Sequence, residues 1–159
     1  MKLALNREYA QRHLFVAILM FSLSCWFGYD GIVRYPAMPA ADLYRSIEKA
    51  EAPQGFDLEA FKRQKTQTQY GFALLSLLTA LIVGLRLAKE TLLNFEYDDN
   101  GFSVNGKYRR YDEISSVDKS RWEKKGILSL KLADGAKVVL DSWHRLGVKE
   151  FAARLEKSI

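Results

Sequence analysis

The residues of this chain that could carry out chemistry are few and lie far apart in the sequence. There are two histidines, His13 and His144, and one cysteine, Cys25, which lies within a long apolar run. A zinc site needs several Cys or His ligands at short spacings, and a disulfide needs a second cysteine. We therefore expect no metal, no cofactor and no disulfide, and we interpret Cys25 as a small packing residue.

Neighbouring acids occur at Asp98/Asp99 and Asp112/Glu113, where one carboxyl group could act as an acid and the other as a base. Turn formation explains both pairs better, because Asp side chains hydrogen-bond to the nearby backbone of turns. The sequence has no glycine-rich phosphate loop, no G-x-S-x-G and no dinucleotide fingerprint. It predicts no catalytic residues and no enzyme; the alternative is an enzyme whose bound cofactor leaves no motif.

The candidate binding surface lies between residues 107 and 125, where basic and aromatic residues are interleaved. Its residues are Lys107, Tyr108, Arg109, Arg110, Tyr111, Lys119, Arg121, Trp122, Lys124 and Lys125. Such a surface suits anionic lipid headgroups or a partner, and it also suits single-stranded nucleic acid. Because the charge of residues 90–159 is nearly balanced, we expect no nucleic acid. The alternative interpretation is a solvated strand face with Trp122 in the core.

Two long apolar runs surround these candidates in the sequence. Leu14–Tyr29 and Tyr70–Leu85 contain no charged residue. Extended to residues 14–33 and 70–89, each reaches the roughly 20 residues that a membrane helix needs. Two transmembrane helices are therefore expected. One alternative is a pair of buried core helices, which would usually keep a polar stripe. The other is a cleaved signal peptide, although the first run is long for one and no clear A-x-A site follows.

Small residues recur every four positions along both runs, which lets helix backbones approach closely in lipid. They are Ser24 and Gly28 in the first run, and Ser76, Ala80 and Gly84 in the second. This spacing predicts that the two helices pack together as a hairpin.

The net charge of +5 comes from 24 Lys and Arg against 19 Asp and Glu. Most of the excess lies in the N-terminal tail, residues 1–13, and just after the second run. The loop, residues 34–69, holds six Lys and Arg against five in those two segments, so the positive-inside count does not decide the orientation. A basic N-terminal tail and a C-terminal domain are more easily kept in the cytoplasm than moved across the membrane, so we favour cytoplasmic termini.

The loop itself is expected to be helical. Leu43, Ile47 and Ala50 share one face of a helix over residues 39–50. Asp57 is a suitable N-cap for a second helix that begins at Leu58 and runs into the second span without a breaker. The loop is either a cap on the hairpin or a docking surface for another protein.

The C-terminal segment, residues 90–159, alternates between short apolar runs and turns. The turns are expected at Asn100-Gly101, Asn105-Gly106 and Asp134-Gly135. Strands are expected near 92–97, 101–104, 107–111, 114–122, 126–132 and 136–141. A final amphipathic helix buries Val148, Phe151, Ala152, Leu155 and Ile159. The fold class is thus a membrane α-helical hairpin plus a small α+β domain, an antiparallel meander capped by a C-terminal helix.

This meander with one C-terminal helix resembles the pleckstrin-homology (PH) fold. The stretches that carry the resemblance are FEYDDNGFSVNG, YDEISSVDKSRWEKKGI and GVKEFAARLEKSI. The arrangement of a helical hairpin before such a domain is similar to many small bacterial two-pass membrane proteins, which implies the bacterial inner membrane. Eukaryotic relatives often bind phosphoinositides through basic residues of an early hairpin, whereas the hairpin here carries the acidic sequence DDNG.

Together these features predict a non-enzymatic membrane protein that acts as an accessory or scaffold subunit. Its expected partners are membrane lipids and either another protein of a membrane assembly or a second copy of itself. The alternative is a protein that senses anionic lipid through Lys107, Arg109, Arg110, Arg121, Trp122, Lys124 and Lys125.

Overall fold

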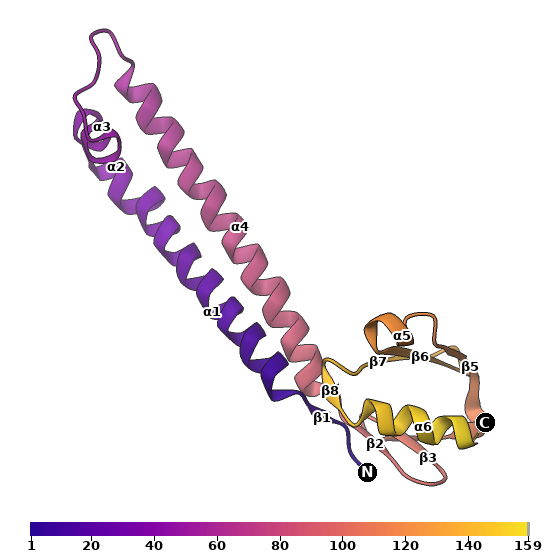
Figure 1. Cartoon of the computed structure of the whole chain (residues 1–159). Helices are drawn as coiled ribbons and strands as arrows, with labels where there is room; N and C mark the ends of the chain where they lie inside the picture. Colours follow the sequence, from indigo (N-terminus) through magenta and orange to yellow (C-terminus); the bar gives the residue numbers. More distant parts are fainter. Residues whose placement is uncertain (159) are drawn as a thin grey trace. The chain divides into compact units, whose positions relative to one another are not determined.

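The structure is a computed structural model that describes residues 1–158 (Figure 1). The chain forms two compact units: residues 14–84 form one, and residues 1–13 together with 85–159 form the other. Ile159, expected on the apolar face of the last helix, lies outside the described residues. Residues 1–13 were expected as a tail of their own, and the structure groups them with the C-terminal segment.

The first unit is a helical hairpin built from parts of two long helices. Helix α1 (Arg7–Tyr29) continues through a π-helical turn (Asp30–Arg34) into the short α2 (Tyr35–Ala37). Helix α4 (Leu58–Leu92) is continuous. This confirms the expectation that a helix beginning at Leu58 continues into the second apolar run, because no Gly or Pro occurs between Leu58 and Gly71. Asp57 caps it, because its Oδ1 accepts the N–H of Ala60 at 2.8 Å.

A small apolar cluster closes the far end of this hairpin. Helix α3 (Ala40–Glu48) buries Leu43 completely and is followed by Lys49, whose φ of 59° is left-handed and ends the helix. The ring of Tyr44 lies 5.0 Å from the rings of both Phe56 and Phe61. The expected loop helix is confirmed, although it ends two residues before Ala50.

Both long helices are long and apolar enough to span a membrane. Only 11% of the most apolar 18-residue stretch of each is buried inside the protein. Large apolar side chains such as Phe15 and Leu75 are 67% and 62% exposed. The core helix of a water-soluble protein buries such residues, so this burial pattern does not fit the alternative of two core helices.

The second unit contains two three-stranded antiparallel sheets. The first has the order β2 (Phe95–Tyr97), β3 (Gly101–Val104), β4 (Lys107–Arg110), and the second β5 (Ile114–Asp118), β6 (Ile127–Leu132), β7 (Lys137–Asp141). Asn105 and Gly106 have φ of 51° and 82°, which confirms the expected tight turn between β3 and β4.

Both sheets and helix α6 (Val148–Ser158) share one apolar core. Phe151 of α6 is fully buried, with its ring 5.0 Å from Phe95 and 6.1 Å from Phe102. Leu128 and Leu140 reach the same core from the second sheet. The expected α+β class and the capping C-terminal helix are confirmed.

The strand expected over residues 114–122 is too long. It ends at Asp118, because the Asp118 carboxylate accepts the N–H of Ser120 at 2.9 Å and starts a turn. Trp122 therefore lies in a short helix, α5 (Trp122–Lys125). Likewise β2 starts only at Phe95, since α4 continues to Leu92.

A short N-terminal strand, absent from the expectations, completes this unit. Strand β1 (Ala4–Leu5) pairs antiparallel with β8 (Arg145–Leu146). The N–H of Leu3 donates to the carbonyl of Phe95 at 2.9 Å, and the Leu3 side chain is 1% exposed. The first residues are therefore an integral part of the α+β domain.

Candidate functional site

A buried ion pair joins strand β8 to the last turn of α4. Arg145, 3% exposed, has its Nε 3.4 Å from the Oε2 of Glu90. Its guanidinium also donates to the carbonyl oxygens of Glu90 and of Leu3. Because an unpaired buried charge is costly, this contact holds β1, β8 and the end of α4 together.

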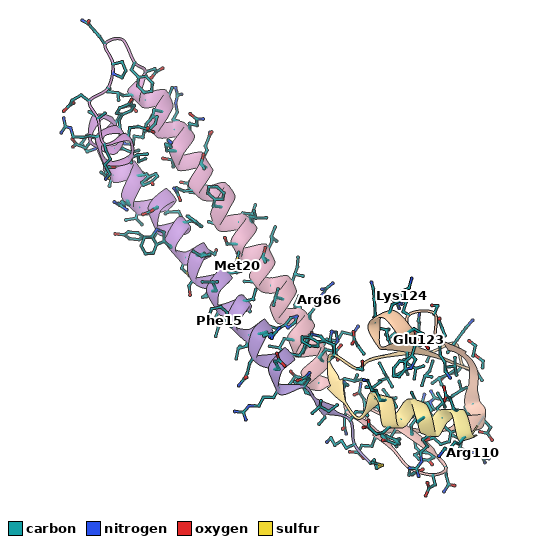
Figure 2. All side chains as sticks on the ribbon, in the orientation of Figure 1. Phe15, Met20, Arg86, Arg110, Glu123 and Lys124 are labelled. Carbon is teal, nitrogen blue, oxygen red and sulfur yellow. The ribbon has the colours of Figure 1, made fainter. Side chains whose placement is uncertain are left out.

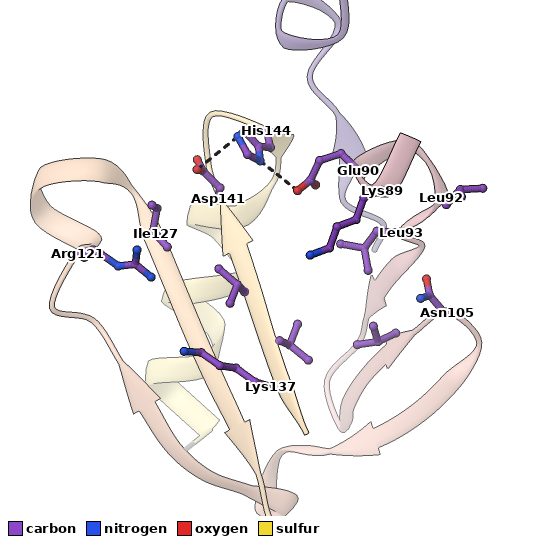
Figure 3. A pocket seen from close by; sticks show the side chains of 13 residues that line it. Lys89, Glu90, Leu92, Leu93, Asn105, Arg121, Ile127, Lys137, Asp141 and His144 are labelled. Atoms are coloured by element: carbon purple, nitrogen blue, oxygen red, sulfur yellow. Dashed lines mark hydrogen bonds and ion pairs between the residues drawn. The ribbon is translucent and has the colours of Figure 1, made fainter. Parts of the chain in front are cut away.

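His144 lies next to this ion pair, between two carboxylates (Figure 3). Its Nδ1 is 3.2 Å from Glu90 Oε1, and its Nε2 is 3.6 Å from Asp141 Oδ2. The ring also packs on Tyr9 at 4.2 Å. Burial, and then the negative charge of Glu90, raise the pKa of Tyr9 above its ordinary value.

These acidic and imidazole groups do not converge on a metal position. The two carboxylates approach opposite nitrogens of the His144 ring, so they cannot share one ion with it. Within residues 1–158 no group of three or more His, Cys, Asp or Glu side chains could hold a metal ion. The cluster is best described as a set of ion pairs and hydrogen bonds.

A cavity of about 690 Å³ opens beside this cluster, between the end of α4, the turn after β3 and strand β7 (Figure 3). Its size falls within the range of small-ligand sites in proteins, about 300–1,000 Å³. Leu92, Leu93, Val104, Ile127 and Val139 supply apolar surface. The cavity is therefore large enough for a short peptide segment or for one small organic molecule.

Three cations also line this cavity: Lys89, Arg121 and Lys137. In the part of the chain that the structure describes, none of them lies within 4.0 Å of a carboxylate oxygen. The two acids of the lining are engaged, Glu90 by Arg145 and His144, and Asp141 by His144. Asp118 compensates the charges of Arg121 and Lys137 in part, over a longer distance, and the charge that remains in the cavity is positive.

The basic surface expected over residues 107–125 is divided in the structure. Arg109 contacts Asp134 and lies 3.1 Å from Glu113, and only 14% of its side chain is exposed. Arg110 pairs with Asp112 at 2.8 Å. Their positive charges are thus largely compensated within the domain.

The remaining candidates of that surface lie mostly around α5. Arg121 precedes this helix, and Lys124 and Lys125 form its last turn. Trp122 packs partly against the core, while Lys107 is exposed on β4. Lys124 and Arg110 lie apart in the domain (Figure 2). The structure therefore brings Arg121, Lys124 and Lys125 together and separates them from the arginines of β4.

The small residues of the hairpin occupy two kinds of environment. Ser24 donates through Oγ to the carbonyl of Ala73 at 2.9 Å, and both Ser76 and Ala80 are buried. A Cβ atom at Gly28 or Gly84 would meet no other atom within 4 Å. The closest approach lies at Gly31, where a Cβ atom would be 3.1 Å from the Tyr70 ring.

Asp30 forms a second polar site, within the π-helical turn of the hairpin. Its side chain is 9% exposed, and its Oδ1 lies 3.4 Å from Nη1 of Arg34. Nearby in the same hairpin, Gln69 donates to the Tyr35 hydroxyl at 3.2 Å. π-Helical turns are frequent at functional sites. The two contacts here are separate, and the Oε1 of Gln69 is buried without a hydrogen-bond partner among the described residues.

Comparison of this chain with protein-family models, with curated proteins and with solved structures finds no match.

Proposed function

We propose that this chain is a two-pass inner-membrane protein of bacteria, with a PH-like domain that binds another subunit of a membrane assembly. It acts as an accessory or scaffold subunit and carries out no reaction of its own. Residues 14–33 and 70–89 cross the bilayer, and both termini lie in the cytoplasm. The observation that carries the proposal is the pair of long helices whose apolar side chains face outward.

The pairing of β1 with β8 supports a two-span arrangement over a single span. A strand pair cannot form across a bilayer, so residues 1–13 and the domain after α4 must lie on the same side. Two crossings satisfy this requirement, and one crossing does not. The same pairing supports retention of the first span, because cleavage after it would remove β1 and Tyr9 from the domain.

The α+β domain supports binding better than catalysis. Its two sheets and capping helix are compatible with the PH-like class, whose members commonly present surfaces to lipids or proteins. The cavity beside β7 joins apolar walls to three cations, and among the described residues that line it no nucleophile is paired to a base. Such a lining binds and orients a partner.

Purification of the full chain in mild detergent, after cross-linking in intact cells, tests this function. We expect one or more membrane proteins to co-purify in fixed proportion. Reporter fusions to the loop and to the C-terminus test the topology, with the loop expected outside. A monodisperse monomer with no cross-linked partner would contradict the scaffold role, and a cytoplasmic loop would contradict the orientation.

A second candidate function is the sensing of anionic lipid by the cations around α5. The observation that favours it is that Arg121, Lys124 and Lys125 gather there without a carboxylate within 4.0 Å among residues 1–158. In nanodiscs containing phosphatidylglycerol, the amides of α5 should exchange more slowly than in neutral nanodiscs. Equal exchange in both lipids would remove this candidate.

A further inference from the structure

One edge of the second sheet is left without a neighbouring strand. Strand β7 is the last strand of that sheet, whose order is β5-β6-β7. The N–H of Leu132 donates to Ala136 at 2.9 Å, and the N–H of Ser142 donates to Gly126 at 3.0 Å. Because backbone groups alternate along a strand, those of Val138 and Leu140 face β6, and those of the residues between them face away.

The outward-facing backbone groups of β7 belong to Lys137 and Val139. Across residues 1–158, no strand other than β6 pairs with them. The outer edge of β2, in the first sheet, is covered. There the N–H of Leu3 donates to the carbonyl of Phe95, and the N–H of Tyr97 donates to the carbonyl of Met1. The domain thus covers one sheet edge with its own N-terminal segment and leaves the edge of β7 open.

The open edge faces the cavity described above. Lys89 and Leu93 point from the end of α4 into the space beside β7 (Figure 3). Val139 is 46% exposed at the edge itself. A strand of four residues is about 13 Å long, and neighbouring strands lie about 4.8 Å apart. The space of about 690 Å³ suits a short extended segment better than a helix, which is about 10 Å wide.

The charge of the cavity indicates which charge a bound segment should carry. Lys89, Arg121 and Lys137 have no carboxylate within 4.0 Å in the described chain, whereas the acids of the lining are paired. An acidic segment would therefore be attracted. Lysine on an edge strand also opposes pairing with an identical edge, which disfavours a second copy as the occupant.

We infer that the free edge of β7 binds an extended acidic segment of a partner protein, which adds to the sheet as a further strand beside Lys137 and Val139. This inference rests on the proposed role as an interaction module and specifies its surface. Residues of the segment opposite Lys137 are acidic, because directly opposed side chains share one face of a sheet. The alternate residues are apolar, because they share the face of the buried Val138.

A synthetic peptide tests this site directly. The probe is a fluorescein-labelled hexapeptide of alternating glutamate and valine, added to the full chain in a non-ionic detergent. We expect saturable binding by fluorescence anisotropy, with a Kd of about 100 µM or tighter. The lysine-valine peptide and a version of the acidic peptide methylated at alternate backbone nitrogens should bind at least tenfold more weakly.

Three variants locate the binding on β7. Val139→Pro removes an outward N–H without touching the pairing with β6, and should weaken binding about tenfold or more. Lys137→Glu should weaken it about fivefold or more. Lys149→Glu is the matched control, because Lys149 is exposed on α6 and does not line the cavity. Circular dichroism and thermal melting confirm that each variant is folded.

The outcomes separate this inference from the proposed function. Absence of saturable binding up to about 1 mM peptide, or equal binding by Val139→Pro and the unaltered chain, overturns strand addition. If a partner co-purifies equally well with Val139→Pro, strand addition is wrong and the scaffold role stands. If the chain forms a dimer that Val139→Pro dissociates, the edge belongs to a second copy and the acidic segment is wrong.

Discussion

The helical hairpin and the α+β domain bury opposite kinds of residue. In the domain, the fully buried side chains are large and apolar, as Phe102 and Phe151 show. Within residues 14–33 and 70–89 of the hairpin, the buried residues are Asp30, Gly31, Ser76 and Ala80, and Phe15 is 67% exposed. The domain buries large apolar side chains as a protein in water does, whereas the two long helices of the hairpin expose such side chains and bury small or polar ones.

This difference shows which force stabilises each unit. Burial of apolar surface from water stabilises the domain core by roughly 25 cal/mol per Å². For helices in lipid, where the proposed function places α1 and α4, that term is small, and close packing of small residues and bonds such as Ser24 Oγ to Ala73 O would hold the helices together. The same substitution should therefore have different effects in the two units.

The largest difference is expected for phenylalanine-to-alanine substitutions. Phe151→Ala empties the centre of the core and should lower the free energy of unfolding of the domain by about 3–5 kcal/mol. Phe15→Ala should change it by less than about 0.5 kcal/mol, because Phe15 lies in the hairpin and its side chain is 67% exposed. Denaturant unfolding of the full chain in detergent, followed by hydrogen exchange of β6 amides, measures both. Equal losses would contradict the comparison.

The buried ion pair gives the next largest effect. Glu90→Ala leaves the guanidinium of Arg145 buried without its carboxylate and should destabilise the domain by about 3 kcal/mol. The double variant Glu90→Ala/Arg145→Met should recover part of the loss, because no uncompensated charge remains. The same unfolding measurement applies. A double variant less stable than the sum of both single changes would argue against this explanation.

In the hairpin, enlarging a buried small residue tests the close packing of the spans. Ser76→Leu should push the helices apart and cost about 1–3 kcal/mol. Ser22→Leu is the matched control, since Ser22 is exposed and bonds only to Ile18 of its own helix. Thermal unfolding in detergent, monitored by the helical circular dichroism signal, reports the loss. A similar change for both variants would show that Ser76 is not a packing residue.

The smallest effect expected is the pH dependence of the domain. A hydrogen bond from the N–H of Arg110, and then one from the Arg109 side chain, lower the pKa of Glu113. A lowered pKa contributes stability that is present above the ordinary Glu value, about 4.3, and is lost as pH falls through the folded value. In Glu113→Gln, the free energy of unfolding of the domain should therefore fall less steeply below about pH 4 than in the unaltered chain. Glu59→Gln, in the hairpin, should leave this pH dependence of the domain unchanged.

Local signals in the sequence predict most of the secondary structure. The N-cap Asp57, the Asn105-Gly106 turn and the apolar face of α6 all act between residues close in the chain, and each is confirmed. Strands β1 and β8 are two residues long, so they have no detectable periodicity. Their pairing depends on the burial of Leu3 and Arg145, which only the folded domain provides.

The cationic cavity was harder to predict than the helices. The basic residues of segment 107–125 suggested one continuous surface, but Arg109 and Arg110 are paired with acids of their own turns. Lys89 and Lys137 join Arg121 instead, from segments far apart in the sequence. The alternation in Lys137-Val138-Val139-Leu140 was the one available signal, since it places Lys137 and Val139 on one face.

The short strand β1 also determines when the domain can be completed during synthesis. At about 5–20 residues per second, roughly 7–28 s separate the synthesis of Leu5 from that of Arg145, its partner in β8. During that interval Leu3 and Tyr9 have no core to enter. A chain that stops before residue 145 would keep them exposed, so incomplete synthesis would be visible to proteases at the opposite end of the chain.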